Sequence, residues 1–276
     1  MEHAIETEVG RLAVFEEGNG PVLFFWPSLY LDHRSFELVV ADLASERRCV
    51  VVDGPGHGRS PGPGRPFDMA TCARAAMQVL DALGIGAVDW VGNAWGGAVG
   101  VRAAIDVPQR IRSLTAIGTP MQPLSSKMRL QTRVLLPMLR LGMADRVGAL
   151  VAAVMLPPCA ARSLHEEVQR VVREAPRAAL METIRSVSIR RADLVGELAK
   201  IACPTLFVAG GDDAMWPPDV AAAQASRIPG ARSVTLPGAG HLGPLERPRE
   251  TAGFIRAHLR EAARNASSEE ARVQRR

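Results

Sequence analysis

Three short loops carry residues whose types and spacing could do chemistry, and each loop follows a stretch typical of a buried strand. The first loop, Gly92–Gly96, places glycines two residues before and two residues after Ala94. The second loop carries Asp213, with Asp212 beside it, and the third carries His241, 28 residues beyond Asp213. An aspartate that orients a histidine can make it a general base, so these two loops could carry an acid–base pair.

Each loop also has a purely structural explanation. Asp213 could cap a helix that begins near Pro217, and His241 could be a buried histidine that closes its own loop. The glycines around Ala94 allow a very tight turn from a strand into a helix, because small flanking residues let two backbones approach. We expect such a turn to hold position 94 outward in a strained conformation.

The three loops, taken in this order, resemble those of the α/β-hydrolase superfamily, and the resemblance extends over residues 22–263. The nucleophile elbow of that family is Gly-x-Ser-x-Gly, or Gly-x-Asp-x-Gly in haloalkane dehalogenases and soluble epoxide hydrolases. Residues Asp53–Ser60 are similar to the family's Asp-x-Pro-Gly-x-Gly-x-Ser turn, in which we interpret His57 as structural. The resemblance implies an α/β fold with a mostly parallel, eight-stranded sheet, flanking helices and a helical cap insertion. By the position of each loop after its strand, it implies Asp213 as the acid, with Asp212 as the second candidate, and His241 as the base. It also implies a hydrolase that acts on a small apolar ester, lactone or related carbonyl substrate.

Ala94 stands where that family has its nucleophile. A methyl group cannot attack a carbonyl carbon, so no covalent intermediate can form at this position. Three interpretations stay open. In the first, the chain is an inactivated variant of a protein with serine or aspartate at position 94. In the second, the Asp213–His241 dyad acts directly as a general base, as in lyases and cofactor-free oxygenases of the superfamily. In the third, the protein binds a ligand without turning it over. We favour an enzyme of the hydrolase type.

The same resemblance implies an oxyanion hole made by the backbone N–H groups of Ser28 and Trp95. These donors belong to the main chain and do not depend on a nucleophilic side chain. The hydroxyl of Ser28 could in addition contact a substrate or act as a displaced nucleophile. Trp26, Trp216 and Leu242 lie next to the loops of the site, and we expect them to form walls of the substrate pocket.

Apolar periodicity predicts strands that alternate with helices, which is typical of a parallel sheet covered by helices on both faces. The predicted strands are His3–Thr7, Arg11–Glu17, Val22–Trp26, Cys49–Val52, Ala87–Val91, Ile111–Ile117, Thr205–Ala209 and Ser233–Leu236. The predicted helices of this alternating pattern are Ser35–Glu46, Asp68–Leu83, Trp95–Ile105, Val220–Arg227 and Pro248–Ala263.

Residues 120–200 interrupt the alternation, because helical periodicity continues there without an intervening strand. We therefore expect a core formed by residues 1–119 and 201–264, a helical cap at 120–200 and a frayed tail at 265–276. The cap contains 13 basic and 7 acidic residues. It is either a solvated helical surface or a patch that attracts acidic substrates or carrier proteins. Its many Leu, Met and Val residues either pack its helices together or line an apolar, adaptable pocket.

The composition, 47% hydrophobic and 22% charged over 276 residues with a net charge of +4, fits one globular domain with an insertion. The basic residues are interleaved with acidic ones, which disfavours nucleic-acid binding. The four cysteines lie far apart, so we expect no disulfide framework, no metal site and no cofactor. No apolar run is long enough to span a membrane and no signal peptide is recognisable, so we expect a cytoplasmic protein. The expected partner is a small apolar substrate or ligand, and the oligomeric state is left open.

Overall fold

The computed structural model of the chain describes residues 1–62 and 64–273, and side chains up to residue 265. One sheet of eight strands forms its centre, in the order β1-β2-β4-β3-β5-β6-β7-β8. The strands are β1 (Glu2–Thr7), β2 (Gly10–Glu17), β3 (Val22–Trp26), β4 (Arg48–Val52), β5 (Val88–Asn93), β6 (Ile111–Ile117), β7 (Thr205–Gly210) and β8 (Arg232–Leu236). Strand β2 pairs antiparallel with β1 and β4, and the pairs from β4 to β8 are parallel. The mostly parallel, eight-stranded sheet predicted from the sequence is therefore confirmed.

Helices cover both faces of this sheet. They are α1 (Glu37–Leu43), α2 (Met69–Ala82), α3 (Trp95–Asp106), α8 (Pro218–Ala225), α9 (Gly243–Glu246) and α10 (Pro248–Val273). Alternate residues of β3 belong to different apolar clusters, because successive side chains of a strand point to opposite faces. Phe24 and Trp26 pack with residues of α2 and α3, whereas Leu23 and Phe25 pack with residues of α1 and α10. The continuously apolar sequence of β3 follows from this double burial.

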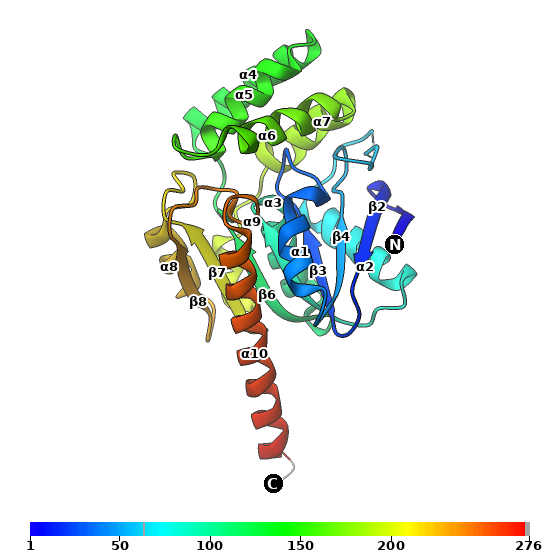
Figure 1. Ribbon diagram of the computed structural model, residues 1–276, viewed down its shortest axis with the longest axis vertical. Coiled ribbons are helices and arrows are strands. Elements are labelled where there is room, and N and C mark those ends of the chain that lie inside the picture. The colour runs from blue at the N-terminus through cyan, green and yellow to red at the C-terminus, as the bar shows by residue number, and fades with distance from the viewer. Residues whose placement is uncertain (63, 274–276) are drawn as a thin grey trace.

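The helical insertion lies between β6 and β7. Its helices are α4 (Ser126–Arg140), α5 (Ala144–Met155), α6 (Arg162–Glu174) and α7 (Arg177–Ile184), followed by the short helical turns Arg185–Ile189 and Val195–Lys200. In Figure 1 these helices gather at one end of the sheet, while α10 projects past the opposite end. We refer to residues 120–200 as the cap, and to the sheet with its flanking helices as the core.

The last helix is longer than the sequence interpretation suggested. Helix α10 runs through most of the segment expected to be a frayed tail and reaches Val273, while residues 274–276 lie outside the described part of the chain. No glycine or proline follows Gly253, so no residue type that breaks a helix is present there. Within the described residues, no helix is long and apolar enough to cross a membrane.

Candidate active site

The strand-to-helix turn predicted around Ala94 is present and tight. Ala94 connects β5 to α3 with φ 49° and ψ −106°, a conformation that L-residues rarely adopt. The flanking glycines are required by contact: a Cβ on Gly96 would lie 1.8 Å from the carbonyl oxygen of Trp26, and a Cβ on Gly92 would lie 2.2 Å from the Gly96 carbonyl carbon. The backbone N–H of Ala94 donates to the carbonyl oxygen of Ile117 at 2.8 Å, which holds the turn against β6.

Asp213 and His241 are brought together at the carboxyl ends of β7 and β8. The Nδ1–H of His241 donates to Oδ2 of Asp213 at 2.9 Å, and both side chains are buried. The other carboxylate oxygen of Asp213 accepts the backbone N–H groups of Met215 and Trp216 at 2.8 and 3.0 Å. The carboxylate thus closes a turn and orients the imidazole at the same time. Asp212, the second acid considered from the sequence, is exposed.

Two residues that sequence reasoning did not select support the loop of His241. The carboxylate of Glu246 accepts the backbone N–H groups of Gly240 and Leu242, both at 2.8 Å. Burial raises the pKa of Glu246, and these two hydrogen bonds partly oppose that shift. The side-chain amide of Asn93 donates to the carbonyl oxygen of His241 at 3.0 Å. Neither residue belongs to a sequence motif that could have revealed it. Asn93 binds a backbone group that is far away in the sequence, and Glu246 binds backbone groups of an irregular loop.

The His241 loop is also bound to the cap. The backbone N–H of His241 donates to the carbonyl oxygen of Met155, the last residue of α5, at 3.0 Å. A Cβ on Gly240 would lie 2.8 Å from the Pro157 ring, so cap and core approach each other closely beside the histidine. The position of His241 is therefore fixed from both sides of the site.

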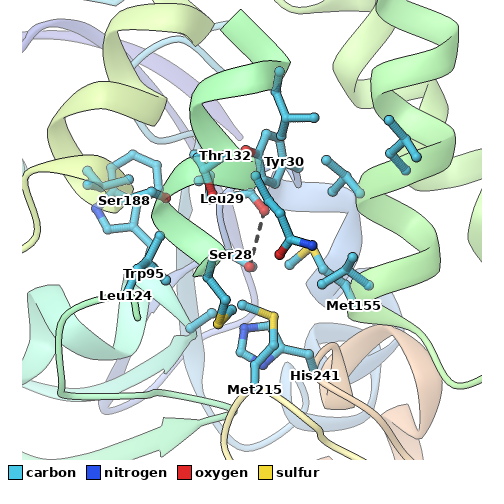
Figure 2. A pocket seen from close by; sticks show the side chains of 18 of the residues that line it. Ser28, Leu29, Tyr30, Trp95, Leu124, Thr132, Met155, Ser188, Met215 and His241 are labelled. Carbon is cyan, nitrogen blue, oxygen red and sulfur yellow. Dashed lines mark hydrogen bonds between the residues drawn. The ribbon is translucent and has the colours of Figure 1, made fainter. Parts of the chain in front are cut away.

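The backbone N–H groups of Ser28 and Trp95, expected to form an oxyanion hole, lie on residues that line one cavity with Ala94. Within the described part of the chain, neither N–H donates to a protein oxygen. The hydroxyl of Ser28 is already used, because it donates to the carbonyl oxygen of Leu29 at 3.2 Å (Figure 2). The next turn is held by His57, whose Nε2 accepts the backbone N–H of Tyr30 at 3.0 Å. Burial lowers the pKa of His57, which keeps its ring neutral and suits this structural role.

The cavity has a volume of about 370 Å³ and lies between the core and the cap. Figure 2 shows His241 and Met215 on one side of it and Thr132 and Tyr30 on the other. The lining residues are Ser28, Leu29, Tyr30, Ala94, Trp95, Leu124, Met128, Gln131, Thr132, Val134, Leu135, Leu150, Val151, Val154, Met155, Val187, Ser188, Arg191, Met215 and His241. Val134, Leu150 and Val154 are 50–60% exposed, so the cavity opens to solvent between α4 and α5. Some of the cap's apolar residues therefore line a pocket, whereas others, such as Leu139, pack in the core cluster.

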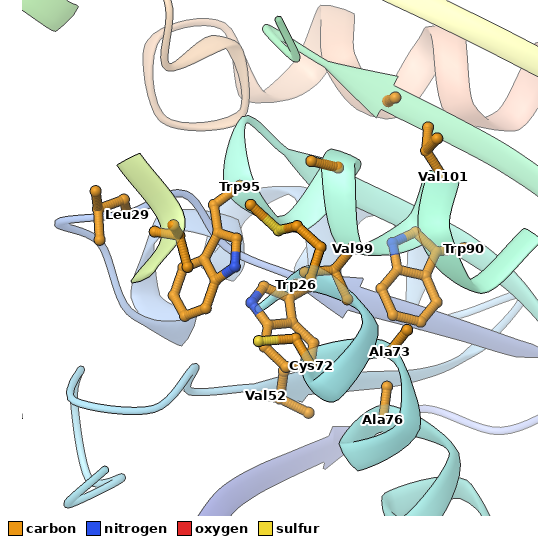
Figure 3. Close-up of a cluster of buried hydrophobic side chains, with 14 of the residues drawn as sticks. Trp26, Leu29, Val52, Cys72, Ala73, Ala76, Trp90, Trp95, Val99 and Val101 are labelled. Atoms are coloured by element: carbon orange, nitrogen blue, oxygen red, sulfur yellow. The ribbon is translucent and has the colours of Figure 1, made fainter. Parts of the chain in front are cut away.

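The three residues expected to form pocket walls do not line this cavity. Trp26, Trp216 and Leu242 are fully buried in the apolar core. Trp26 lies between Trp95 and Trp90, on the face of β3 that α2 and α3 cover (Figure 3). Trp216 turns away because its indole N–H donates to the side-chain oxygen of Gln224 on α8 at 2.9 Å. Met215, one residue earlier, faces the cavity instead.

A family model described as the alpha/beta hydrolase fold matches residues 21–248. The chain belongs to the α/β-hydrolase fold family. A protein of Variovorax paradoxus (strain S110), named as a candidate carbamate hydrolase, RutD, is 32% identical over 261 residues, which cover 91% of each chain.

Solved structures agree with this assignment. A hydrolase from Pseudomonas aeruginosa PA01 superposes on this α/β hydrolase with a TM-score of 0.84 at 26% identity, covering 94% of this chain and 98% of that chain. A thermophilic esterase from Thermogutta terrifontis has a TM-score of 0.87 at 24% identity, covering 95% and 99% respectively, a likeness of fold. In this α/β hydrolase the strand-to-helix turn has a strained backbone, and alanine stands at its centre.

Proposed function

We propose that this α/β hydrolase cleaves a small, largely apolar ester, lactone or related carbonyl substrate, with His241 acting as general base on a water molecule. One observation carries the proposal. His241 is held by Asp213 at 2.9 Å, and it lines the same cavity as Ala94, Ser28 and Trp95. The base that we assign, and the two residues whose backbone N–H groups we assign to the oxyanion hole, therefore line one cavity.

The electron and proton transfers follow from the hydrogen bond to Asp213. Because Nδ1 carries the proton of that bond, Nε2 has a free lone pair and can accept a proton from water. The water oxygen attacks the carbonyl carbon, and the displaced electron pair moves to the carbonyl oxygen, which the N–H groups of Ser28 and Trp95 stabilise. When the tetrahedral intermediate collapses, the bond to the leaving oxygen breaks and the imidazolium of His241 protonates that oxygen. The carboxylate of Asp213 stabilises the transient imidazolium.

The size and lining of the cavity support the substrate class. A volume of about 370 Å³ is near the lower end of the range for small-molecule sites, and apolar side chains form most of the lining. The relative from Variovorax paradoxus is named for a carbamate, which is also a carbonyl compound.

Ala94 favours a second candidate function, which is ligand binding without turnover. A methyl group at the elbow provides no nucleophile, and the cavity and its apolar lining do not depend on one. The two candidates differ in one measurable property, which is whether the Asp213–His241 dyad changes the rate of any reaction.

The test is hydrolysis of short and medium-chain aryl esters by the unmodified chain, Asp213→Asn and Asp212→Asn. Asp212→Asn is the matched control, since that carboxylate lies one residue away and is exposed. We expect turnover by the unmodified chain, a loss of about 100-fold in Asp213→Asn, and no change in Asp212→Asn. Turnover that survives Asp213→Asn would refute the mechanism, and no turnover above the buffer rate would leave ligand binding as the function.

A further inference from the structure

Arg191 lines the cavity and has no charged partner among the described residues. Its Nε is buried without a hydrogen bond, and its remaining contact is a long one, 3.4 Å from a terminal nitrogen to the carbonyl oxygen of Gln122. No ion pair joins it to a carboxylate within the described residues. Arg102 and Arg170, which are also largely shielded from solvent, bind two and three carboxylates respectively.

The surroundings of Arg191 do not neutralise it. Burial lowers its pKa to about 10, so the guanidinium stays protonated at neutral pH. Of the 20 described residues that line the cavity, none is acidic, and Arg191 is the one lysine or arginine among them. Arg191 as a whole is half-buried, but its Nε is shut off from solvent without a hydrogen bond among the described residues. An anion that enters the cavity supplies the acceptor and the counter-charge that this guanidinium lacks.

A carboxylate fits this position best. The planar guanidinium presents parallel N–H groups that match the two oxygens of a carboxylate. Ser188, one turn earlier in the chain, and Thr132 on α4 line the same cavity and offer hydroxyl groups to the same ligand (Figure 2). The rest of the lining is mostly apolar and suits a short hydrocarbon segment.

We propose that Arg191 binds a carboxylate of the substrate, so that the ligand has an acid group at one end and a reactive carbonyl group at the other. This inference rests on the proposed function only for the reaction at the carbonyl group. The anion site itself belongs to the cap and does not require turnover.

The experiment measures binding rather than activity. Linear keto acids with two to six methylene groups between ketone and carboxylate are titrated calorimetrically into the unmodified chain, and each is compared with its keto amide. The amide has nearly the same shape without the charge, and a ketone has no ester bond to cleave. We expect the best keto acid to bind at least about tenfold more tightly than its amide, as for a hydrogen bond between charged groups.

The variants are Arg191→Gln, Arg191→Lys and the control Arg140→Gln, which removes an equal charge from an exposed position of α4. We expect Arg191→Gln to abolish the preference for the acid, Arg191→Lys to retain part of it, and Arg140→Gln to retain all of it. Far-UV circular dichroism melts identify a variant that does not fold. In that case the ratio of the affinities of the unmodified chain for keto acid and keto amide still tests the anion site.

Equal binding of acid and amide, no binding of any keto acid, or an unchanged preference in folded Arg191→Gln would overturn the anion site. Failure of the anion site and failure of the proposed function are distinguishable. Aryl-ester turnover without acid preference refutes the role of Arg191 alone, whereas acid preference without turnover refutes catalysis alone.

Discussion

The cavity has two unlike sides, one supplied by the core and the other by the cap. On the core side, hydrogen bonds hold the loop of His241: its ring is bound by Asp213, its carbonyl oxygen by Asn93, and the amides on either side of it by Glu246. On the cap side, the lining is mostly aliphatic side chains of α4 and α5, together with Arg191, a cation that no carboxylate of the described residues pairs with.

The difference separates two tasks within one site. The ends of β3, β5, β7 and β8 meet at one edge of the sheet, so the topology itself fixes the relative positions of the groups that can act on a carbonyl. Cap side chains can change without moving these groups, because most of them contact the cavity through apolar surface. We therefore infer that the core determines the reaction and that the cap determines which molecule is bound.

The largest effect should come from restoring a nucleophile to the core side. Ala94→Ser places a hydroxyl at the strained turn, in the cavity that His241 lines. We expect the rate of 4-nitrophenyl butyrate hydrolysis to rise by about 1,000-fold or more, since a nucleophile with its base contributes at least this much in serine hydrolases. Stopped-flow or steady-state release of 4-nitrophenol measures it.

Ala94→Gly is the matched variant, because it alters the same side chain without adding oxygen. Its rate should show no such rise. If Ala94→Ser were no faster than Ala94→Gly, the core side would not hold His241 in a reactive position, and the division between core and cap would lose its basis.

The next effect concerns the rigidity of the core side. In Gly96→Ala the new methyl group would meet the carbonyl oxygen of Trp26, at the end of a strand paired on both sides. Because neither backbone can move easily, we expect the free energy of unfolding to fall by about 3 kcal/mol. Urea denaturation measures this change. Gly196→Ala, at a position with open space around it, should change stability by less than about 0.5 kcal/mol, and equal losses in both variants would contradict the argument.

The sequence was sufficient for the fold and for the main polar groups of the site. The Gly-x-x-x-Gly spacing around Ala94 predicted the tight turn because one of its physical causes, the close approach of the Gly92 and Gly96 backbones, is local in sequence. The contact between Asp213 and His241 was predictable for a different reason, since consecutive loops at the carboxyl edge of a parallel sheet lie side by side. The assignment of these two residues as acid and base also used the resemblance to the α/β-hydrolase superfamily.

The walls of the pocket were not predictable, because they depend on the direction of individual side chains. Trp26 and Trp216 lie close to site residues in the sequence. Yet Trp26 faces α2 and α3, and Trp216 is turned away from the cavity by its hydrogen bond to Gln224. Arg191 could not be recognised either. What distinguishes it is that it lines the cavity with a buried Nε that no described residue binds, and this depends on the packing of the whole cap.

The smallest effect concerns the loop that carries Ser28. His57 accepts the backbone N–H of Tyr30 on its Nε2, and burial lowers its pKa, so the folded protein keeps it neutral where the unfolded chain takes up a proton near pH 6.5. A depressed pKa in the folded state means that stability is fully present above pH 6.5 and is lost as the pH falls below it. Between pH 7.5 and pH 5.5, we expect this histidine to lower the free energy of unfolding by at most about 1.4 kcal/mol, the limit for a folded ring that takes up no proton in this range.

His57→Gln tests that assignment, because an amide oxygen can accept the Tyr30 N–H and does not titrate in this range. Urea denaturation at the two pH values should show a smaller acid-dependent loss in the variant, with a difference of at most about 1.4 kcal/mol. Some loss should remain, because burial also lowers the pKa of His258, which lies on α10, away from the cavity. An undiminished loss in His57→Gln would show that the support of the Ser28 loop does not depend on a neutral histidine, and that the core side is less specifically held than its hydrogen bonds indicate.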